Sequence, residues 1–550
     1  MITLNQSLIA ILSIPKKILN KIDYYLKDEV GTVFKDHGGK KRIALIYPNV
    51  YSIGMSNLGF QTIYSILNSR DDVVCERAFL PDKYDLEELK RTGLPVITYE
   101  SKCSISNFDI IALSISFEND YPNIIKILSL SNIPVYSVNR NDSFPLLIAG
   151  GVCCFSNPAP FEDIFDVIFI GESEETINLF LDLYTKRFQK DDIKREIVSI
   201  EGIYIPSFYK TDTIVPKSIY PQAPVFIKKT YFKNFNQIII NPTIKTKNSE
   251  FGHLCLLEVM RGCHWRCRFC LVSSIYNPVR IREKDIMNQE IDKAQSKVGL
   301  IAPSLSDVPY INELISKDNV NFSITSLRSN QKSNSLISLL KDKKSLSIAP
   351  EAGSEKLRRV INKKINEDDI LSTASTAFQK GIEILRLYFM IGLPQERLED
   401  IESIISLTKK ILSLSKSSRI VLTLTPFVPK PFTAFQWHKF EDIKVLKEKI
   451  NFIKKNLNLL SKITINNESV RHSFIQAVFA RGDRKVLKNI IDLSQTGDMN
   501  KIIRDKSLSD KITTCWQYDE PLPWDFIDIG ISKAQLWKEY QSAINDFQSY

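Results

Sequence analysis

No stretch of this sequence approaches the roughly 18 to 20 consecutive apolar residues of a membrane-spanning helix, which excludes a helical membrane protein. The first residues, MITLNQSLIAILSIPKK, contain a short apolar run but neither a basic leader nor a small-residue cleavage site, and do not predict a signal peptide. The nine cysteines are odd in number and mostly scattered, which argues against a disulfide framework. Internal repeats and long low-complexity tracts are also absent. We therefore expect a cytoplasmic protein.

The length of 550 residues is too great for a single core and predicts about two to four domains. The formal charge of +10 comes mainly from lysines scattered along the chain. Such a spread gives only weak support to a nucleic-acid partner. A multidomain enzyme or assembly factor is the default expectation.

The first half alternates apolar strand-like runs with helical patterns. After a helical lead-in over residues 1–40, the strand candidates are RIALIYP, VVCERAFLP, DIIALSIS, PLLIAGG and DVIFIGE. Continuous apolar strands separated by helices are typical of a parallel sheet covered on both faces. We predict a Rossmann-like, doubly wound domain over residues 41–190, with its ligand at the carboxyl ends of the strands.

A second alternation follows a polar, turn-rich connector over residues 191–250. Its strand candidates are CLLEVM, VGLIAP, NFSITSL, SLSIAP, ILRLYFMIG and IVLTLTPF. A helix is predicted from Asn366, a suitable cap, to Lys380, with Gly381 ending it. Six strand-helix units predict a partial (β/α) barrel over residues 251–435, with chemistry at the strand carboxyl ends. Residues 436–550 are predicted to be mainly helical. The fold class is therefore α/β with two parallel-sheet domains.

The segment RGCHWRCRFC, residues 261–270, directly follows the first of these strands and is called the cysteine segment here. Its thiols, Cys263, Cys267 and Cys270, are soft ligands suited to an iron-sulfur cluster or to zinc. Three cysteines can hold three corners of a cubane cluster and leave one iron open. A closed zinc site needs a fourth ligand, for which His253 or His264 is the candidate.

The spacing CxxxCxxC resembles the signature of the radical S-adenosylmethionine (SAM) superfamily. The resemblance implies a 4Fe-4S cluster whose open iron binds SAM and cleaves it to a 5'-deoxyadenosyl radical. It also implies an electron donor such as flavodoxin or ferredoxin, and a position near the adenine for Phe269. Three arginines of the segment, Arg261, Arg266 and Arg268, fit either a solvated basic edge or contacts with an anionic group.

Further segments resemble the SAM-binding parts of this superfamily. APEAGSEKLRR offers Glu351 and Ser354 for the ribose, although a helix N-cap explains these residues equally well. LRLYFMIGLPQE resembles the segment beside the adenine, with Gly392 allowing close approach and Arg386 as a partner for the SAM carboxylate. APSLSD, 302–307, takes the place of a glycine-rich segment but lacks its GGE sequence.

The N-terminal domain resembles those that bind cobalamin in related enzymes. The DxHxxG motif of classical cobalamin domains corresponds to NVYSIG, where Asn49 replaces the aspartate, Tyr51 replaces the cobalt-binding histidine and Gly54 keeps the glycine. The positions that contact the nucleotide tail in such domains correspond to Ser114, Gly150 and Gly151. Any cobalamin would lack a protein ligand to cobalt, and turn glycines of an ordinary doubly wound fold explain the pattern equally well.

Several longer segments together, such as IAPEAGSEKLRRVINK and FVPKPFTAFQW, resemble a bacterial family of radical SAM enzymes with a cobalamin-binding-like N-terminal domain. The resemblance implies hydrogen abstraction, with methyl transfer or ring formation if cobalamin is present, on a substrate that the residues do not identify. One alternative is an RNA-modifying enzyme similar to methylthiotransferases, with a second cluster. Another is a non-catalytic scaffold stapled by metal. The candidate ligands of a second cluster are Cys75, Cys103, Cys153 and Cys154. The RGD at residues 481–483 is interpreted as surface polar residues.

Overall fold

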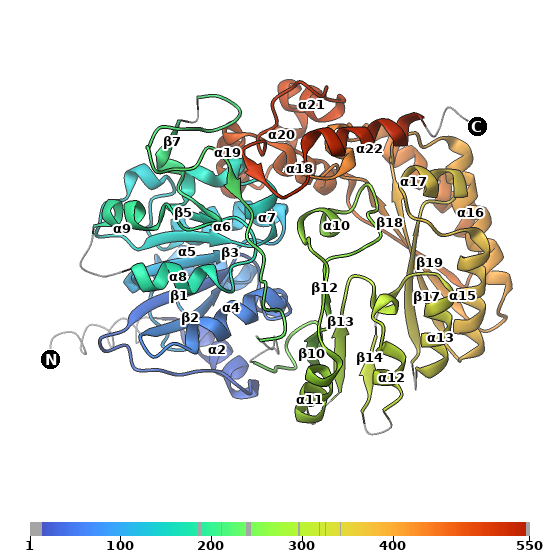
Figure 1. Cartoon of the computed structure of the whole chain (residues 1–550), viewed down its shortest axis with the longest axis horizontal. Coiled ribbons are helices and arrows are strands. Elements are labelled where there is room, and N and C mark those ends of the chain that lie inside the picture. Colours follow the sequence, from blue (N-terminus) through green and yellow to red (C-terminus); the bar gives the residue numbers. More distant parts are fainter. Residues whose placement is uncertain are drawn as a thin grey trace.

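The structure, a computed structural model, is a mixed α/β fold with several parallel sheets. It describes residues 14–184, 189–210, 212–237, 244–252, 254–294, 297–317, 320–324, 326–340 and 343–545. Two sheet-containing units lie beside each other, and helices from the end of the chain lie across both of them (Figure 1). Over the described ranges, no helix has the length and apolar character needed to cross a membrane.

The first unit is built on a six-stranded sheet of order β2-β1-β3-β4-β5-β6. Its first five strands are parallel, and β6 is antiparallel to β5. The strands are β1 (Lys41–Tyr47), β2 (Val73–Phe79), β3 (Ile110–Ser114), β4 (Leu146–Gly150), β5 (Val167–Phe169) and β6 (Ile203–Tyr204). The helices are α4 (Leu58–Asn68), α5 (Lys83–Thr92), α6 (Tyr121–Leu130), α7 (Val152–Ser156), α8 (Thr176–Leu183) and α9 (Lys190–Ile197). All five strands expected from the apolar runs of this half are present.

Both segments that flank this unit contribute to it. The described part of the predicted lead-in forms α2 (Lys16–Asp28), whose Ile18 and Ile22 pack with Leu89 and Ile97. The predicted connector is more than a connector, because β6 adds to the sheet. It also forms the hairpin β7 (Tyr209–Lys210) and β8 (Lys217–Ser218), and β9 (Ile227–Lys228), which pairs with β20 (Ile527–Asp528). Strands of two residues are too short to show a periodic pattern in the sequence.

The second unit contains two parallel sheets, β10-β13-β14 and β15-β16-β17-β18-β19. The strands are β10 (Cys255–Glu258), β13 (Val298–Ile301), β14 (Phe322–Ser323), β15 (Ser326–Leu327), β16 (Ser345–Glu351), β17 (Ile384–Ile391), β18 (Arg419–Pro426) and β19 (Ile463–Asn467). The outer helices are α11 (Lys284–Ala294), α12 (Ile311–Ile315), α13 (Gln331–Leu339), α14 (Glu355–Val360), α15 (Glu367–Gln379), α16 (Leu398–Ser413) and α17 (Ile443–Leu457). Helix α15 is as predicted, with a capping box at Asn366 and Gly381 in a left-handed conformation at φ +82°. The run NFSITSL, expected as one strand, forms the two short strands β14 and β15.

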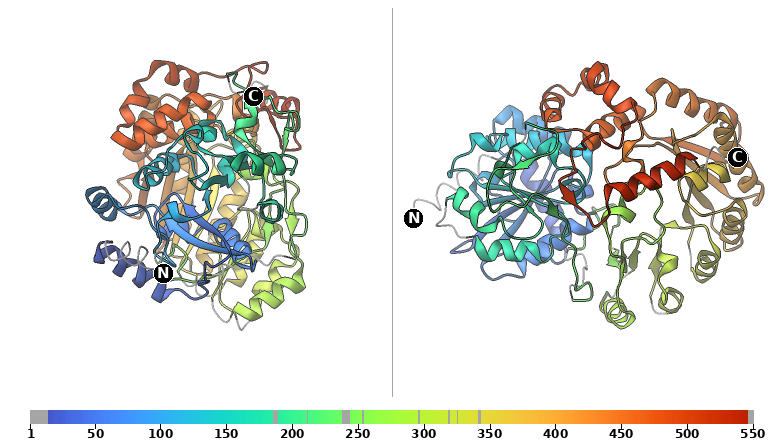
Figure 2. Two further views of the ribbon diagram at one scale, coloured as in Figure 1. Left: turned by 90° about the vertical axis from the view of Figure 1, so that its left-hand side faces the viewer. Right: turned by 45° about the horizontal axis from the view of Figure 1, so that its top comes forward.

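The C-terminal region is mainly helical, as expected, but β19 extends the second parallel sheet beyond the strands predicted from sequence. Only Ile463 of this edge strand is buried, so its sequence lacks the apolar alternation of a covered strand. The helices are α18 (Val470–Arg481), α19 (Leu487–Thr496), α20 (Met499–Arg504), α21 (Lys506–Thr513) and α22 (Lys533–Asn545). Helix α22 passes across the second unit in a view from above (Figure 2).

The interpretation of the RGD sequence as surface residues is wrong for its arginine. Arg481 is fully buried. Its guanidinium carbon lies 3.8 Å from the centre of the Trp516 ring, and Nη1 donates to the carbonyl oxygen of Ile512. Stacking on an indole lets a guanidinium enter the interior, a placement that a local motif does not indicate.

Candidate functional site

The cysteine segment connects β11 (Met260–Arg261) to α10 (Leu271–Ile275), which begins directly after Cys270. Strand β11 pairs with β12 (Arg280–Ile281), so the segment is closed at its base by a short antiparallel ribbon. Gly262 adopts φ +83°, and a Cβ there would lie 2.2 Å from the carbonyl oxygen of Tyr276. Glycine is therefore required for the chain to turn into the segment.

The far side of the segment is fixed by Arg268, which is buried. Its backbone N–H donates to the carbonyl oxygen of Ile361 at 3.0 Å, and Nη1 donates to that of Val360 at 2.9 Å. Its Nη2 donates to Ser542 Oγ of α22 at 3.1 Å. Arg268 thus joins the segment to the end of α14 and to α22, and does not form a solvated edge.

Trp265 and Arg266 are held from the opposite side. Trp265 Nε1 donates to Asp307 Oδ2 at 2.5 Å, and the guanidinium carbon of Arg328 lies 3.8 Å from the centre of the Trp265 ring. Arg266 is exposed, but its carbonyl oxygen accepts a hydrogen bond from Asn362 Nδ2 at 2.9 Å. Asp307 belongs to APSLSD, whose role here is to position the tryptophan of the segment. Nothing in the sequence pattern indicated Arg328 or Asn362.

All three thiols are half-buried. Burial raises the pKa of each thiol, while the positive charges of Lys363 and Arg328 oppose this effect at Cys267. Lys363 Nζ also contacts Glu351 Oε1 at 3.0 Å, which brings the end of β16 close to the thiols. Sequence reasoning missed Lys363, since a lysine between helices carries no distinctive pattern.

The donor set fits a cluster better than a single zinc ion. Within the described ranges, no three His, Cys, Asp or Glu side chains come together closely enough to hold one metal ion. Ligands of one zinc ion all lie about 2.0 to 2.3 Å from it, whereas the irons of a cubane are separate corners. Of the two candidate histidines for zinc, His264 is exposed and His253 lies outside the described residues. The chemistry of three thiols on one anchored segment is that of the ligands that hold iron-sulfur clusters.

The other residues that were predicted to bind SAM lie at different positions along and around the strands of the second unit. Glu351 ends β16 with φ +68°, while Ser354 caps α14 and donates to Asp400. Phe269 is half-buried against the core. Gly392 adopts φ +86°, a left-handed conformation that favours glycine, and a Cβ there would also lie 2.9 Å from Leu446 Cδ2 of α17. Arg386 lies on β17, three residues before Phe389, the residue paired with Glu351.

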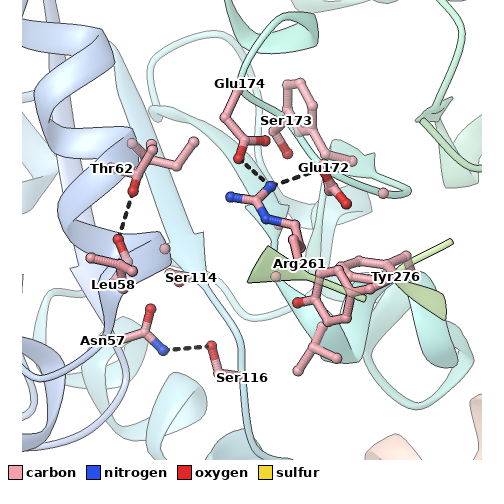
Figure 3. Close-up of a pocket in the computed structure, with 18 of the residues that line it drawn as sticks. Asn57, Leu58, Thr62, Ser114, Ser116, Glu172, Ser173, Glu174, Arg261 and Tyr276 are labelled. Atoms are coloured by element: carbon pink, nitrogen blue, oxygen red, sulfur yellow. Dashed lines mark hydrogen bonds and ion pairs between the residues drawn. The ribbon is translucent and has the colours of Figure 1, made fainter. Parts of the chain in front are cut away.

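A cavity of ≈650 Å³ lies at the carboxyl edge of the first sheet (Figure 3). Apolar residues of β1, β3, β4, α4 and α8 line its depth, and it reaches β11 and Gly262 at the base of the cysteine segment. Of the residues predicted to bind cobalamin, Ser114, Gly150 and Gly151 line the cavity. We call this space the sheet-edge cavity.

Asn49, Tyr51 and Gly54 do not line the sheet-edge cavity, because protein contacts hold them. Tyr51 stacks on Tyr25 with ring centres 4.1 Å apart, and its hydroxyl donates to Glu29 Oε1 at 2.6 Å. Asn49 Nδ2 donates to Asp120 Oδ1 at 2.8 Å. A Cβ at Gly54 would lie 2.5 Å from the Phe79 ring. The described lining is mainly apolar with some polar side chains, and it offers no histidine that could bind cobalt.

An ion-pair network lies where the sheet-edge cavity meets the start of the cysteine segment. Arg261 contacts Glu172 at 2.7 Å, Glu174 at 2.6 Å and Glu258 at 2.8 Å. Arg280 contacts Glu172 at 2.6 Å. Figure 3 shows Arg261 pointing toward Glu172 and Glu174. These five residues, the Arg261 network, join residues 171–175 of the first unit, GESEE, to the start of the cysteine segment.

The four cysteines considered for a second cluster do not form a site. Cys75, Cys153 and Cys154 are buried in the hydrophobic core, and Cys103 packs partly against it. Cys75 lies on β2, which is separated from β4 and the following helix α7 by β1 and β3. Burial raises the pKa of Cys75, Cys153 and Cys154 well above that of a free thiol, as expected for core residues.

Comparison with known proteins gives two family matches. The family described as "Radical SAM proteins, N-terminal" matches residues 59–206, and "Radical SAM superfamily" matches residues 257–408. The relative named "Uncharacterized protein MJ0966", from Methanocaldococcus jannaschii, is 34% identical over 457 residues, which are 82% of this chain and 90% of that protein.

Two solved structures show weaker similarity. The cobalamin-dependent SAM radical enzyme OxsB is 16% identical with a TM-score of 0.45, over 67% of this chain and 51% of that one. Coproporphyrinogen III oxidase (HemN) from Escherichia coli is 18% identical with a TM-score of 0.28, over 37% and 52% of the two chains. The chain thus spans about half the length of each of these structures. The two family matches and the extended similarity to the relative place this chain in the radical SAM superfamily.

Proposed function

We propose that this chain is a radical SAM enzyme that holds a 4Fe-4S cluster on Cys263, Cys267 and Cys270. The observation that carries the proposal is the half-buried set of three thiols on one short segment that is anchored at both ends by Arg261 and Arg268. When bound, the cluster and SAM supply radical chemistry that removes a hydrogen atom from an unreactive carbon. The strand orders support a doubly wound N-terminal domain and a partial barrel, with the thiols at the carboxyl ends of the strands.

Residues around the cysteine segment have distinct roles in this proposal. Glu351, oriented by Lys363, accepts hydrogen bonds from the ribose hydroxyls of SAM. Phe269 packs beside the adenine, and Gly392 shapes the strand end near it. Ser354 acts through its N-cap, which fixes the turn after Glu351. Arg268 and Trp265 keep the thiols in position and shield them from water.

The sheet-edge cavity supports cobalamin as an additional cofactor. Ser114, Gly150 and Gly151 would hold its nucleotide tail, while the cobalt would have no ligand from the described lining residues. With cobalamin bound, the enzyme would gain methyl transfer or ring-forming chemistry. A small protein reductant, such as flavodoxin or ferredoxin, is the expected electron donor.

Anaerobic reconstitution tests this function. We expect about four irons per chain, a brown protein, and conversion of SAM to 5'-deoxyadenosine or S-adenosylhomocysteine with dithionite. Cys267→Ala should fold but lose iron and activity, because it removes one of three cluster ligands. Cys103→Ala is the matched control and should keep all four irons. A colourless or zinc-containing protein, or about eight irons in the wild type with fewer in Cys103→Ala, would overturn the assignment.

A further inference from the structure

The strands β16, β17 and β18 have one buried face and one open face. On β17, Leu385, Leu387, Phe389 and Ile391 are buried. The outer helices lie along one side of this sheet (Figure 1). The alternate residues of the same strand are half-buried or exposed. Strands β16 and β18 show the same alternation. The face of this sheet that points away from the outer helices is therefore not fully covered, and we call it the inner face.

The inner face is lined mainly by polar residues. Cross-strand pairing places Ser347, Arg386, Val421 and Thr464 in one row, and Tyr388, Thr423 and Asn466 in the next. In closed (β/α) barrels, the inward positions are filled by bulky branched apolar residues that pack into a core. Serine, threonine, asparagine and arginine at these positions cannot form such a core. The inner face is thus suited to hydrogen bonding with a bound molecule.

Arg386 is the distinctive residue of the inner face. Among the residues that the structure describes, its side chain makes no hydrogen bond or ion pair with the protein. Arg419 lies one row lower, opposite Ile384. Neither row contains a carboxylate, since their other members are Ser345, Ile384, Ser347, Val421 and Thr464. The half-buried guanidinium of Arg386, which has no counter-charge in its row, favours an anionic ligand, and the exposed Arg419 adds positive charge one row lower.

The register separates Arg386 from the cofactor end of the sheet. Glu351 pairs with Phe389, three residues beyond Arg386, which corresponds to about 10 Å along the strand. The backbone at Arg386 therefore lies below the level of Glu351 at the end of β16. Tyr388 lies between these levels and is 38% exposed, so its ring is free to contact a flat group.

We propose that the inner face binds the substrate, and that this substrate carries a phosphate or carboxylate group held by Arg386. Its central part lies along Tyr388, Thr423 and Asn466, and its reacting carbon lies toward Glu351 and the thiols. The inference rests on the proposed function for the identity of the site as a substrate site. It replaces the expectation that Arg386 binds the carboxylate of SAM.

Equilibrium dialysis of the reconstituted holoenzyme with radiolabelled phosphate and radiolabelled acetate tests the anion site and distinguishes its two chemistries. Arg386→Gln removes the charge but keeps a polar side chain, and should bind the preferred probe at least about tenfold more weakly. Arg386→Lys should retain part of the binding. Arg91→Gln, which alters an exposed arginine of the first unit, is the matched control and should bind like the wild type. Wild-type protein that binds neither probe, or Arg386→Gln that binds as tightly as the wild type, would overturn the proposal.

The electron paramagnetic resonance spectrum of the reduced cluster separates the substrate role from a SAM role. SAM should change this spectrum equally in the wild type and in Arg386→Gln. Loss of the change in the variant alone would assign Arg386 to SAM and overturn the inference. Loss of the change in the wild type would contradict the proposed function, while the dialysis would still report on the anion site.

Discussion

Replacing Arg261 by methionine tests whether the Arg261 network holds the cysteine segment against the first unit. The side chain of Arg261 is 12% exposed, and those of Glu172, Glu174 and Glu258 are 4%, 7% and 12% exposed. Methionine retains much of the aliphatic volume but provides no charge. The network then changes from three carboxylates with two guanidiniums to three carboxylates with one.

The expected cost follows from this charge imbalance. Removing one partner of a buried ion pair typically costs about 3 to 5 kcal/mol, because the remaining charges stay desolvated without compensation. Arg280 still neutralises Glu172, so we expect the lower end, about 3 kcal/mol. For a cooperative unit of about 150 to 250 residues, this corresponds to a decrease in Tm of roughly 6 to 12 °C.

Thermal unfolding and iron content measure the two consequences. Arg261→Met should unfold earlier and lose iron faster under a chelator, and adding Glu174→Gln should recover part of the stability by removing a carboxylate. Burial raises the pKa of Glu172, but the bond from Arg280 and the charge of Arg261 outweigh this and lower it below its usual 4.5. The wild-type advantage should therefore be complete above pH 4.5 and decline as pH falls through the lowered pKa. A variant with unchanged Tm and iron retention would refute this reasoning.

Two further predictions concern the first unit. Burial raises the pKa of Asp120 to about 7, although the hydrogen bond from Asn49 acts in the opposite direction. The free energy of unfolding of the wild type should therefore fall as pH rises from 3.8 toward 7. Asp120→Asn should flatten this pH dependence in chemical unfolding, and an unchanged pH dependence would contradict the assignment. Gly171 has φ +118°, and a Cβ there would lie 2.3 Å from the carbonyl oxygen of Thr230. Gly171→Ala should lower the free energy of unfolding by about 2 kcal/mol or more in the same assay. A Cβ at Gly381 would meet no atom within 4 Å, so Gly381→Ala should lower it by less. Equal effects of the two substitutions would contradict this reasoning.

Most strands of the fold could be predicted from apolar patterns in the sequence. The runs that became β1, β2, β3 and β4 are continuous because helices or neighbouring elements cover the strands, and such burial is visible in local sequence. Strand β19 was missed because an edge strand with one buried residue looks like a loop. The short strands of the connector were missed for a similar reason.

Only some residues of the candidate site could be predicted from the sequence. Whether a residue could be predicted depends on whether its partners lie close to it in the sequence. The thiols are recognisable because a cluster needs ligands at fixed spacing along the chain. Tyr51 could be matched to a cobalamin motif by its position in the sequence. The orientation of its side chain, however, is set by contacts with Tyr25 and Glu29, which belong to the N-terminal lead-in. Arg268 resembled a surface residue because its partners on α14 and α22 are distant in sequence.

The anchoring of the cysteine segment shows why its ligands alone do not define the site. Arg261 at its start is bound to glutamates of the first unit, and Arg268 near its end is bound to the end of α14 and to α22. The segment is therefore clamped by parts of the chain that lie about 90 residues before it and about 270 residues after it. In the proposed function the thiols hold a cluster with one iron left open, so these contacts, and not a fourth ligand, would keep the thiols in position. The first unit and the C-terminal helix would then support the proposed cluster site as directly as the strand that precedes the cysteine segment.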